Sequence, residues 1–350
     1  MAQVLEYQSN AIVELMGVLP AERDAEWLKN SLQQAIMVEI ATIGPYASAL
    51  WSVKEPSAAI AKDIREIIFD EMTHMGLVCN MLTTIGGTPI LADPKVVPKY
   101  EHPLPGGVRP NLLVFLEGLS KQSVEMFSEI ECPEHPVARS GGSATIGAFY
   151  TAIAEVFETQ QHLISGDRQI EFSLESHGQG NKIVPLDTIE KVRAAIEIIK
   201  EQGEGTSASP ENPFPGTPGE LSHFYVFREM FHGKKLIKVS EDPVKWDFKG
   251  DDILLPPASP MARVPEGGWA NSGPNAPTPE VQQVLSAFNK QFSTMLRTLE
   301  AAWQTGDSEM LPAAINCMRK MRAEARKLVQ MELPDGSGKT YGPEFLYVEG

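Results

Sequence analysis

Apolar residues recur every three or four positions in two long stretches of the chain, residues 21–51 and 58–85. This spacing places them along one face of a helix, so both stretches are predicted to be helices that face a core. Residues 55–57 form a short connection between them, and two helices joined in this way lie antiparallel. Pro45 falls within the first stretch and predicts a kink or a change of register there, because proline lacks a backbone N–H.

Ionisable residues fall on the apolar face of both predicted helices. Glu39 lies seven residues after Leu32, and Glu71 lies seven residues after Ile64. His74 follows Glu71 by one helical turn. Buried carboxylates are paired, protonated or bound to metal, and Glu-x-x-His in a helix bundle is a ligand pair of carboxylate-bridged dimetal sites. The alternative is a glutamate and a histidine that hydrogen-bond to polar neighbours at the edge of the core.

The two glutamates are at similar distances along the chain from the connection, about twelve to sixteen residues. Because a helix rises by about 1.5 Å per residue, they lie at similar heights in the predicted bundle. Two core carboxylates and an imidazole at one level favour a metal site between the helices.

Periodicity in the rest of the chain predicts further helices, separated by loops rich in proline and glycine. They cover residues 111–130, 144–163, 186–202, 220 to about 232, 280–304 and 307–332. The last two are separated only at residues 305–307 and are predicted to form a hairpin. We therefore predict a mainly α protein with three parts: a four-helix bundle over 1–235 (core 25–235), an irregular surface-wrapping segment over 236–279 with a short strand at 236–239, and a helical hairpin and tail over 280–350.

A second Glu-x-x-His sequence, Glu220 to His223, opens the helix predicted to end near residue 232. A dimetal bundle needs a second such pair, which favours both side chains as ligands. The competing interpretation of Glu220 is a capping box with Thr217 at the start of the helix. His223 has no such explanation, and it lies beside aromatic residues of the core face.

The helix predicted at 144–163 offers one more carboxylate and imidazole. Its second face combines small residues with Glu155 and His162, which are seven positions apart. This face either leaves room for a metal or faces solvent. Glu155 is the candidate for the third-helix ligand, with Glu125 and Glu158 as alternatives, and His162 is a further candidate ligand.

The charge balance argues against several classes of partner. The chain has 46 acidic and 30 basic residues and a formal net charge of −16. Nucleic-acid backbones and anionic membrane surfaces are bound by clusters of lysine and arginine, so neither is expected. No apolar run approaches the roughly 20 residues that a membrane helix needs. The three cysteines are far apart and the N-terminus has no basic start of a secretion signal, so we expect a cytoplasmic protein with reduced thiols.

Several motifs occur here in an order that is typical of one family. Glu39-Ile40-Ala41-Thr42-Ile43 and Glu71-Met72-Thr73-His74-Met75 are followed by Ile85-Gly86-Gly87-Thr88-Pro89. Thr145-Ile146-Gly147 then precedes Phe149-Tyr150, and Ser222-His223-Phe224-Tyr225 comes last. Over residues 25–235 the chain resembles the ferritin-like domain of the VioB type. That domain occurs in iminophenyl-pyruvate dimer synthases of bisindole pigment pathways and in stand-alone bacterial proteins.

The resemblance implies a ferritin-like four-helix core with a non-haem metal site. Glu39 is then a terminal ligand, Glu71 a bridging carboxylate and His74 a nitrogen ligand. Glu220 and His223 are the matching pair.

One position departs from the family pattern. An acidic residue often stands just before the Phe-Tyr pair, where this chain has Ala148. Either Glu155 replaces that ligand and the site is dinuclear, or the site holds a single metal. Iron is the expected metal and manganese is an alternative, because carboxylates and imidazoles suit both.

The function implied is that of a metal-dependent oxidoreductase, which activates dioxygen to oxidise a small organic substrate. Tyr46, Tyr150 and Tyr225 are candidates to shape the substrate pocket, or are core aromatics. The alternatives are a ferroxidase or iron-binding protein without an organic substrate, and a non-catalytic helical interaction protein in which Glu71 and His74 hydrogen-bond. The expected partners are dioxygen and the substrate, with a homo-oligomer as a further option because the C-terminal helices pack on the bundle or on a second copy of the chain.

Overall fold

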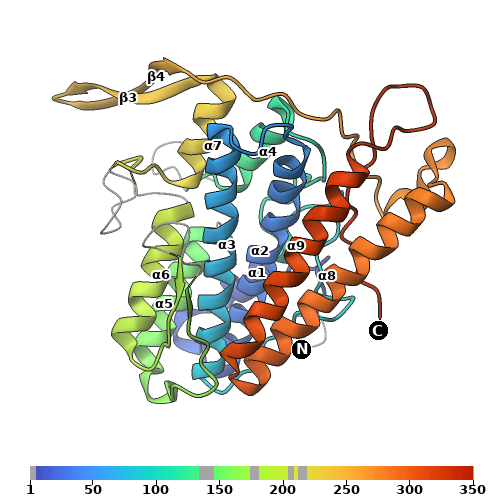
Figure 1. Cartoon of the computed structure of the whole chain (residues 1–350). Coiled ribbons are helices and arrows are strands. Elements are labelled where there is room, and N and C mark those ends of the chain that lie inside the picture. The colour runs from blue at the N-terminus through green and yellow to red at the C-terminus, as the bar shows by residue number, and fades with distance from the viewer. Residues whose placement is uncertain (1–4, 134–145, 174–180, 204–208, 212–218, 350) are drawn as a thin grey trace.

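Two long helices form the centre of the molecule. The computed structural model describes residues 5–133, 146–173, 181–203, 209–211 and 219–349. A short helix α1 (Ala11–Gly17) precedes α2 (Ala25–Ser52) and α3 (Ala59–Thr84), which lie side by side (Figure 1). The Asp24 side chain accepts the backbone N–H of Trp27 at 2.9 Å and so caps the start of α2. The prediction of two long paired helices is confirmed.

The helix α2 continues through Pro45. Proline has no N–H to donate to the carbonyl of residue 41, four positions earlier. The Tyr100 hydroxyl donates to that carbonyl instead, at 3.0 Å. Tyr100 approaches this closely because the neighbouring residue is Gly44, where an added Cβ would lie 2.5 Å from the tyrosine oxygen. The freed carbonyl is therefore satisfied, and α2 runs without interruption to Ser52.

Four shorter helices lie beside this pair: α4 (Lys121–Ile130), α5 (Ile146–Thr159), α6 (Ile189–Gly203) and α7 (His223–His232). The helix α4 packs on α7, and α5 packs on α6. In Figure 1, α7 lies above α6 and α4 lies above α5, next to α3 and α2. The third and fourth positions of the four-helix core are thus each occupied by two short helices, with a break near mid-height.

The helix predicted over 111–130 is wrong in its first half. It begins only at Lys121, where the Ser120 hydroxyl accepts the N–H of Ser123 at 3.1 Å. The preceding residues are held by distant parts of the chain: Val114 pairs with His102, and the Leu116 carbonyl accepts the N–H of Val264 at 2.9 Å. Most of their apolar side chains are buried, but their backbone bonds are not helical.

The other short helices also differ from their predicted bounds. The one predicted from 144 to 163 ends at Thr159 and is followed by one 3₁₀ turn, Gln161–Leu163. The one predicted to open at Glu220 begins at His223, with Ser222 as its N-cap residue. Thr217, the predicted capping partner, lies outside the described residues.

The C-terminal hairpin is confirmed. Its helices are α8 (Pro279–Thr305) and α9 (Leu311–Leu328), which pack on each other and on the α2–α3 pair (Figure 1). The Trp303 indole N–H donates to the Asn80 side-chain oxygen at 2.9 Å and so ties α8 to α3. Within the described residues, no helix is long and apolar enough to cross a membrane.

The segment after α7 has more strand than predicted. β3 (Lys234–Glu241) and β4 (Val244–Asp252) form an antiparallel hairpin that projects from the bundle (Figure 1). The sequence predicts only a short strand at 236–239, because apolar and polar residues alternate only weakly along the rest of this hairpin. A second, two-residue pairing joins β1 (Phe172–Ser173) to β2 (Lys182–Ile183).

Candidate metal centre

Five ionisable side chains meet in the middle of the bundle. Glu39 lies halfway along α2, and Glu71 and His74 lie halfway along α3. Glu131 directly follows the last residue of α4, and His223 is the first residue of α7. All five are buried. They form two groups, Glu39–Glu71–His74 and Glu71–Glu131–His223, whose ligand atoms lie within 4.8 Å of one another in each group.

The breaks in the short helices produce this convergence. At mid-height the α2–α3 pair is continuous and contributes side chains from its buried face. The other two positions of the bundle contribute helix ends: Glu131 at the end of α4, Tyr150 near the start of α5, Gln202 at the end of α6 and His223 at the start of α7. Polar residues at helix ends are brought inward because the core is interrupted at that level.

The first group centres on the Nδ1 atom of His74. This atom lies 3.6 Å from Glu39 Oε2 and 3.7 Å from Glu71 Oε1. Two ligand atoms that bind one metal at about 2.1 Å are separated by roughly 3 to 3.6 Å. The observed spacing is close to that range.

The second group centres on the Nδ1 atom of His223. It lies 3.0 Å from Glu71 Oε1 and 3.8 Å from Glu131 Oε2. Despite the short contact with Glu71, His223 Nδ1 is buried without a partner in hydrogen-bond geometry. A buried nitrogen left in this state costs free energy unless another group occupies its lone pair. Glu71 Oε1 therefore faces both imidazoles, and the two rings are nearly parallel, with centroids 5.8 Å apart.

Each of the five side chains also forms a hydrogen bond with one polar neighbour, through the atom that does not take part in the group. The pairs are Tyr150 hydroxyl to Glu39 Oε1, Thr42 Oγ1 to Glu71 Oε2 at 2.8 Å, Tyr46 hydroxyl to Glu131 Oε1, Gln202 Oε1 to His74 Nε2 at 2.7 Å, and Asp70 Oδ2 to His223 Nε2 at 3.1 Å. The amide oxygen and the carboxylate can only accept, so both histidines carry their proton on Nε2. Nδ1 of each ring then faces the centre and would bind a metal once its own proton is displaced, as metal-binding histidines require.

Without metal, protons on Glu71 and on the two histidines offset the negative charge of the buried carboxylates. Burial and the nearby Glu131 carboxylate together raise the pKa of Glu71 to about 7. Burial lowers the pKa of His74, but the carboxylates of Glu39 and Glu71 outweigh this effect and raise it to about 9. The pKa of His223 is likewise raised well above its ordinary value, since Asp70, Glu131 and Glu71 outweigh its burial.

These residues fit a pair of divalent metal ions. Three carboxylates and two imidazoles are the oxygen and nitrogen donors that iron and manganese take in proteins. Two cations would replace the protons that the two imidazoles carry and would occupy the unpartnered Nδ1 of His223. Glu71 belongs to both groups and is placed to bridge them.

The raised pKa values predict that the metal-free protein loses stability as the pH rises. His74 goes from an ordinary value of 6.5 to about 9, and Glu71 from 4.5 to about 7. Both groups bind protons more tightly in the folded chain, so their contribution is complete below the ordinary pKa and is lost as the pH rises through the folded one. Between pH 6.5 and 9 we expect a loss on the order of 2 kcal/mol in unfolding free energy, measured by urea unfolding with a chelator present.

Matched variants isolate this effect. Glu71→Gln and His74→Gln each remove one titrating group and should flatten the pH dependence. Glu155→Gln, on the exposed face of α5, should leave it unchanged. A metal-free wild type whose stability is constant or rises across this range would contradict the assigned charges.

The structure does not bring two of the sequence-predicted ligands into the groups. Glu155 is exposed on α5, as are Thr151 and Thr159 of the same face. Glu220 lies in the segment before α7 rather than one turn ahead of His223 on a helix, so the two side chains do not share a helical face. Glu39, Glu71, His74 and His223 are brought together as expected, and their binding of metal stays a prediction.

The other candidates lie away from the centre. Glu125 and His162 are exposed, and Glu158 pairs with Arg193 at the surface at 2.6 Å. Tyr46 and Tyr150 contact the candidate ligands directly, whereas Tyr225 is half-buried and packs against Phe224.

The sequence analysis missed Glu131. The residue lies seven positions after Val124 and four after Phe127, two core residues of α4. This is the same spacing that singled out Glu39 and Glu71. The helix is predicted to end at residue 130, just before Glu131, yet this side chain is buried.

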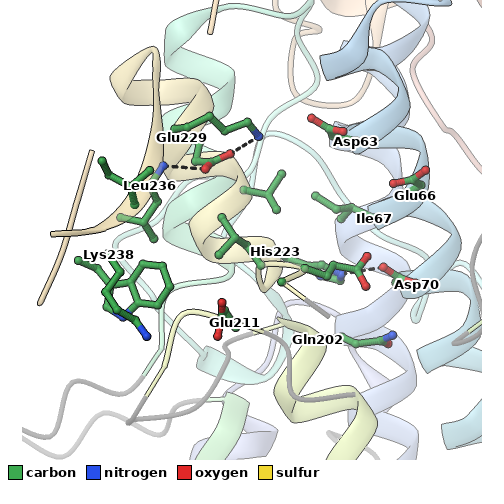
Figure 2. Close-up of a pocket in the computed structure, with 17 residues that line it drawn as sticks. Asp63, Glu66, Ile67, Asp70, Gln202, Glu211, His223, Glu229, Leu236 and Lys238 are labelled. Carbon is green, nitrogen blue, oxygen red and sulfur yellow. Dashed lines mark hydrogen bonds and ion pairs between the residues drawn. The ribbon is translucent and has the colours of Figure 1, made fainter. Parts of the chain in front are cut away.

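Two spaces adjoin the centre. The inner one, about 30 Å³, is lined by Glu39, Glu71, His74, Glu131 and Tyr150 among others. The outer one, about 600 Å³, lies between α3, α7 and the β3–β4 hairpin and reaches His223 and Asp70 (Figure 2). Its lining includes six carboxylates and two lysines, listed together as Asp63, Glu66, Asp70, Glu211, Glu220, Glu229, Lys235 and Lys238. Burial and neighbouring carboxylates raise the pKa of Glu66, consistent with a negative potential in this pocket.

Comparison with known proteins agrees with this architecture. No curated protein matches the chain. A solved structure, a ferritin-like protein from Caulobacter vibrioides, matches with a TM-score of 0.62 and 19% identity, over 92% of this chain and 97% of that one. At this identity the likeness shows the fold alone. The family model described as Ferritin-like matches residues 32–232, more than half of the chain and a range that contains all five residues of the two groups. The chain belongs to the ferritin-like family.

Proposed function

We propose that this protein is a non-haem dimetal oxidoreductase, with iron as the metal, that uses dioxygen to oxidise a small organic substrate. The observation that carries the proposal is the double use of Glu71. One buried carboxylate is shared between two groups, each of which has its own glutamate and its own histidine. Carboxylate-bridged pairs of metals in helix bundles are held by the same kinds of donor, four carboxylates and two histidines, of which this centre supplies three carboxylates and both histidines.

The resemblance to the VioB-type domain supports the same function. Glu39, Glu71, His74 and His223, which the resemblance implies as ligands, all belong to the two groups. The third-helix carboxylate that Ala148 lacks has a replacement in Glu131, which reaches the centre from α4. The proposed site is therefore dinuclear rather than mononuclear, with manganese as the alternative metal.

Iron, when bound, supplies one-electron chemistry with dioxygen that amino-acid side chains lack. The chain's own residues supply geometry and proton control. Gln202 and Asp70 keep the proton of each imidazole on Nε2, so that Nδ1 stays available. Tyr46 and Tyr150 orient one carboxylate each, and burial raises the pKa of both hydroxyls well above the ordinary value. Both phenols therefore remain proton donors at neutral pH.

The two spaces divide the reactants by size. The inner space has the volume of about one water molecule, so it has room for the metals and none for an organic molecule. The outer pocket has a volume typical of small-molecule sites and extends to His223. Since carboxylates outnumber lysines there, we expect a substrate that is neutral or carries an amine, and exclusion of anions.

The same acidic pocket favours a second candidate, oxidation of iron without an organic substrate. Six carboxylates next to His223 would concentrate Fe(II) at the surface of the site. In this case iron is the substrate itself, and the outer pocket guides it inward.

Oxygen uptake separates the two candidates. The protein is loaded anaerobically with two Fe(II) per chain and mixed with oxygenated buffer, with and without a panel of amine-bearing aromatic and aliphatic compounds. The proposed function predicts repeated, compound-dependent oxygen uptake that Glu71→Ala abolishes and Glu155→Ala retains. Uptake that instead follows added Fe(II), with ferric product accumulating, supports the second candidate. No uptake beyond that of Glu71→Ala in either experiment would refute both.

A further inference from the structure

A second large pocket lies on a different face of the central helices. It is enclosed by α2, α3 and the α8–α9 hairpin and has a volume of about 600 Å³. On α2 it is lined by Ile40 and Ile43, each one position after Glu39 and Thr42 of the metal centre. One position is a rotation of about 100° around a helix. Met72 and Met75 on α3 follow Glu71 and His74 in the same way. The two sites therefore lie on different faces of the same helix pair.

The interior of this pocket is apolar and deformable. Five methionines contribute to its wall: Met72, Met75, Met295, Met318 and Met321. Methionine side chains are unbranched and adapt to ligands of different shape, so this wall suits a flexible aliphatic chain better than a rigid ring system. Phe292 and Phe345 add aromatic surface to the lining.

Four arginines line the same pocket: Arg65, Arg319, Arg322 and Arg326. Among the residues that the structure describes, no aspartate or glutamate lines it, although the chain as a whole carries a net charge of −16. Arg65 and Arg326 donate to the backbone carbonyls of Pro56 and Val53, which are neutral groups. Among the described residues, none of the four arginines has a carboxylate within ion-pair distance. The apolar cavity is therefore lined by four arginines, none of which forms an ion pair with a described carboxylate.

We propose that this pocket binds a long-chain carboxylate, with the aliphatic chain among the methionines and the carboxylate at the arginines. Guanidinium groups bind carboxylates in bidentate geometry. Burial of each methylene strengthens binding until the cavity is filled. The proposal uses no residue of the metal centre, so it stands or falls independently of the proposed oxidation.

Titration calorimetry with oleate, on delipidated full-length protein with and without bound iron, tests the proposal. We expect saturable binding of one oleate per chain in both forms, and weaker binding for shorter saturated acids, by about threefold for each methylene removed. Oleyl alcohol, which lacks the charge, should bind at least about fivefold more weakly. Phosphatidylglycerol vesicles should not bind, since the site is a cavity rather than a membrane surface.

Arg319→Gln with Arg322→Gln is the diagnostic variant, because both side chains are exposed and their loss leaves the fold intact. It should weaken oleate binding about tenfold and leave the binding of oleyl alcohol unchanged. Lys290→Gln with Lys320→Gln removes the same charge from exposed positions of α8 and α9 outside the pocket and should change neither. Met318→Trp, which fills the cavity, should abolish binding of both ligands.

Several results would overturn the proposal. They are the absence of saturable oleate binding, equal affinity for oleate and oleyl alcohol, equal weakening by the arginine and lysine variants, and binding to vesicles without binding to free oleate. If Met318→Trp does not fold, the arginine and lysine pairs decide the question alone.

Discussion

Glu71→Ala is expected to remove both metals at once. After anaerobic loading with Fe(II) and desalting, the wild type should retain about two irons per chain, and the variant close to none. The reason is that Glu71 Oε1 lies 3.7 Å from His74 Nδ1 and 3.0 Å from His223 Nδ1, so one substitution takes a ligand from each group. Only the pairs Glu39–His74 and Glu131–His223 remain, and two donors do not hold a labile divalent ion through desalting.

The same variant should make the metal-free protein more stable. Burial raises the pKa of Glu71 to about 7, which means that holding this carboxylate in the core is unfavourable at neutral pH. Removing it relieves about 1 kcal/mol or more, against a smaller cost for the lost bond from Thr42. Iron content by colorimetric assay and unfolding in chelator give the two readouts. If Glu71 serves metal binding rather than stability, the variant loses its metal and becomes more stable.

Other outcomes have distinct meanings. Glu155→Ala, the matched exposed control, should retain both irons and wild-type stability. If the wild type retains no metal, the ferritin-like scaffold serves another purpose, such as the interaction protein considered from the sequence. If Glu71→Ala destabilises the metal-free protein strongly, Glu71 is a structural hydrogen-bonding residue.

Glu131→Ala is expected to reduce the iron content from about two to about one per chain. Glu131 belongs only to the group with His223, so the group of Glu39, Glu71 and His74 keeps its three donors. Its loss also leaves the Tyr46 hydroxyl, which donates to Glu131, without its partner. Glu131→Gln keeps a hydrogen-bond acceptor for Tyr46 while removing the anionic ligand, and so separates metal loss from damage to the core.

This prediction opposes the one made from the sequence, in which Glu155 was the third-helix ligand. His74→Ala should also leave about one iron, on the opposite group, and combining it with Glu131→Ala should leave none. Loss of iron in Glu155→Ala, or two irons retained in Glu131→Ala, would show that the two groups do not correspond to two metal sites.

The sequence by itself determined the half of the centre that lies on α2 and α3. Both helices have a strong apolar periodicity and are joined by a short connection, so the faces and relative heights of Glu39, Glu71 and His74 follow from local spacing. The α8–α9 hairpin followed from the same kind of pattern. These features depend on interactions within one helix or between neighbours in the chain.

Only the tertiary structure decided the other half. Residues 111–120 carry apolar side chains like a helix, but their backbone bonds to His102 and Val264, which are distant in the chain, and α4 therefore starts late. The break between α4 and α5 turns Glu131 inward, and the start of α7 separates Glu220 from His223. Periodicity reports which side of a helix is apolar, whereas the point at which a helix stops against distant backbone depends on the whole fold. Of the two candidate ligands at helix ends, His223 was indicated by its motif, whereas Glu131 could be assigned only once that fold was known.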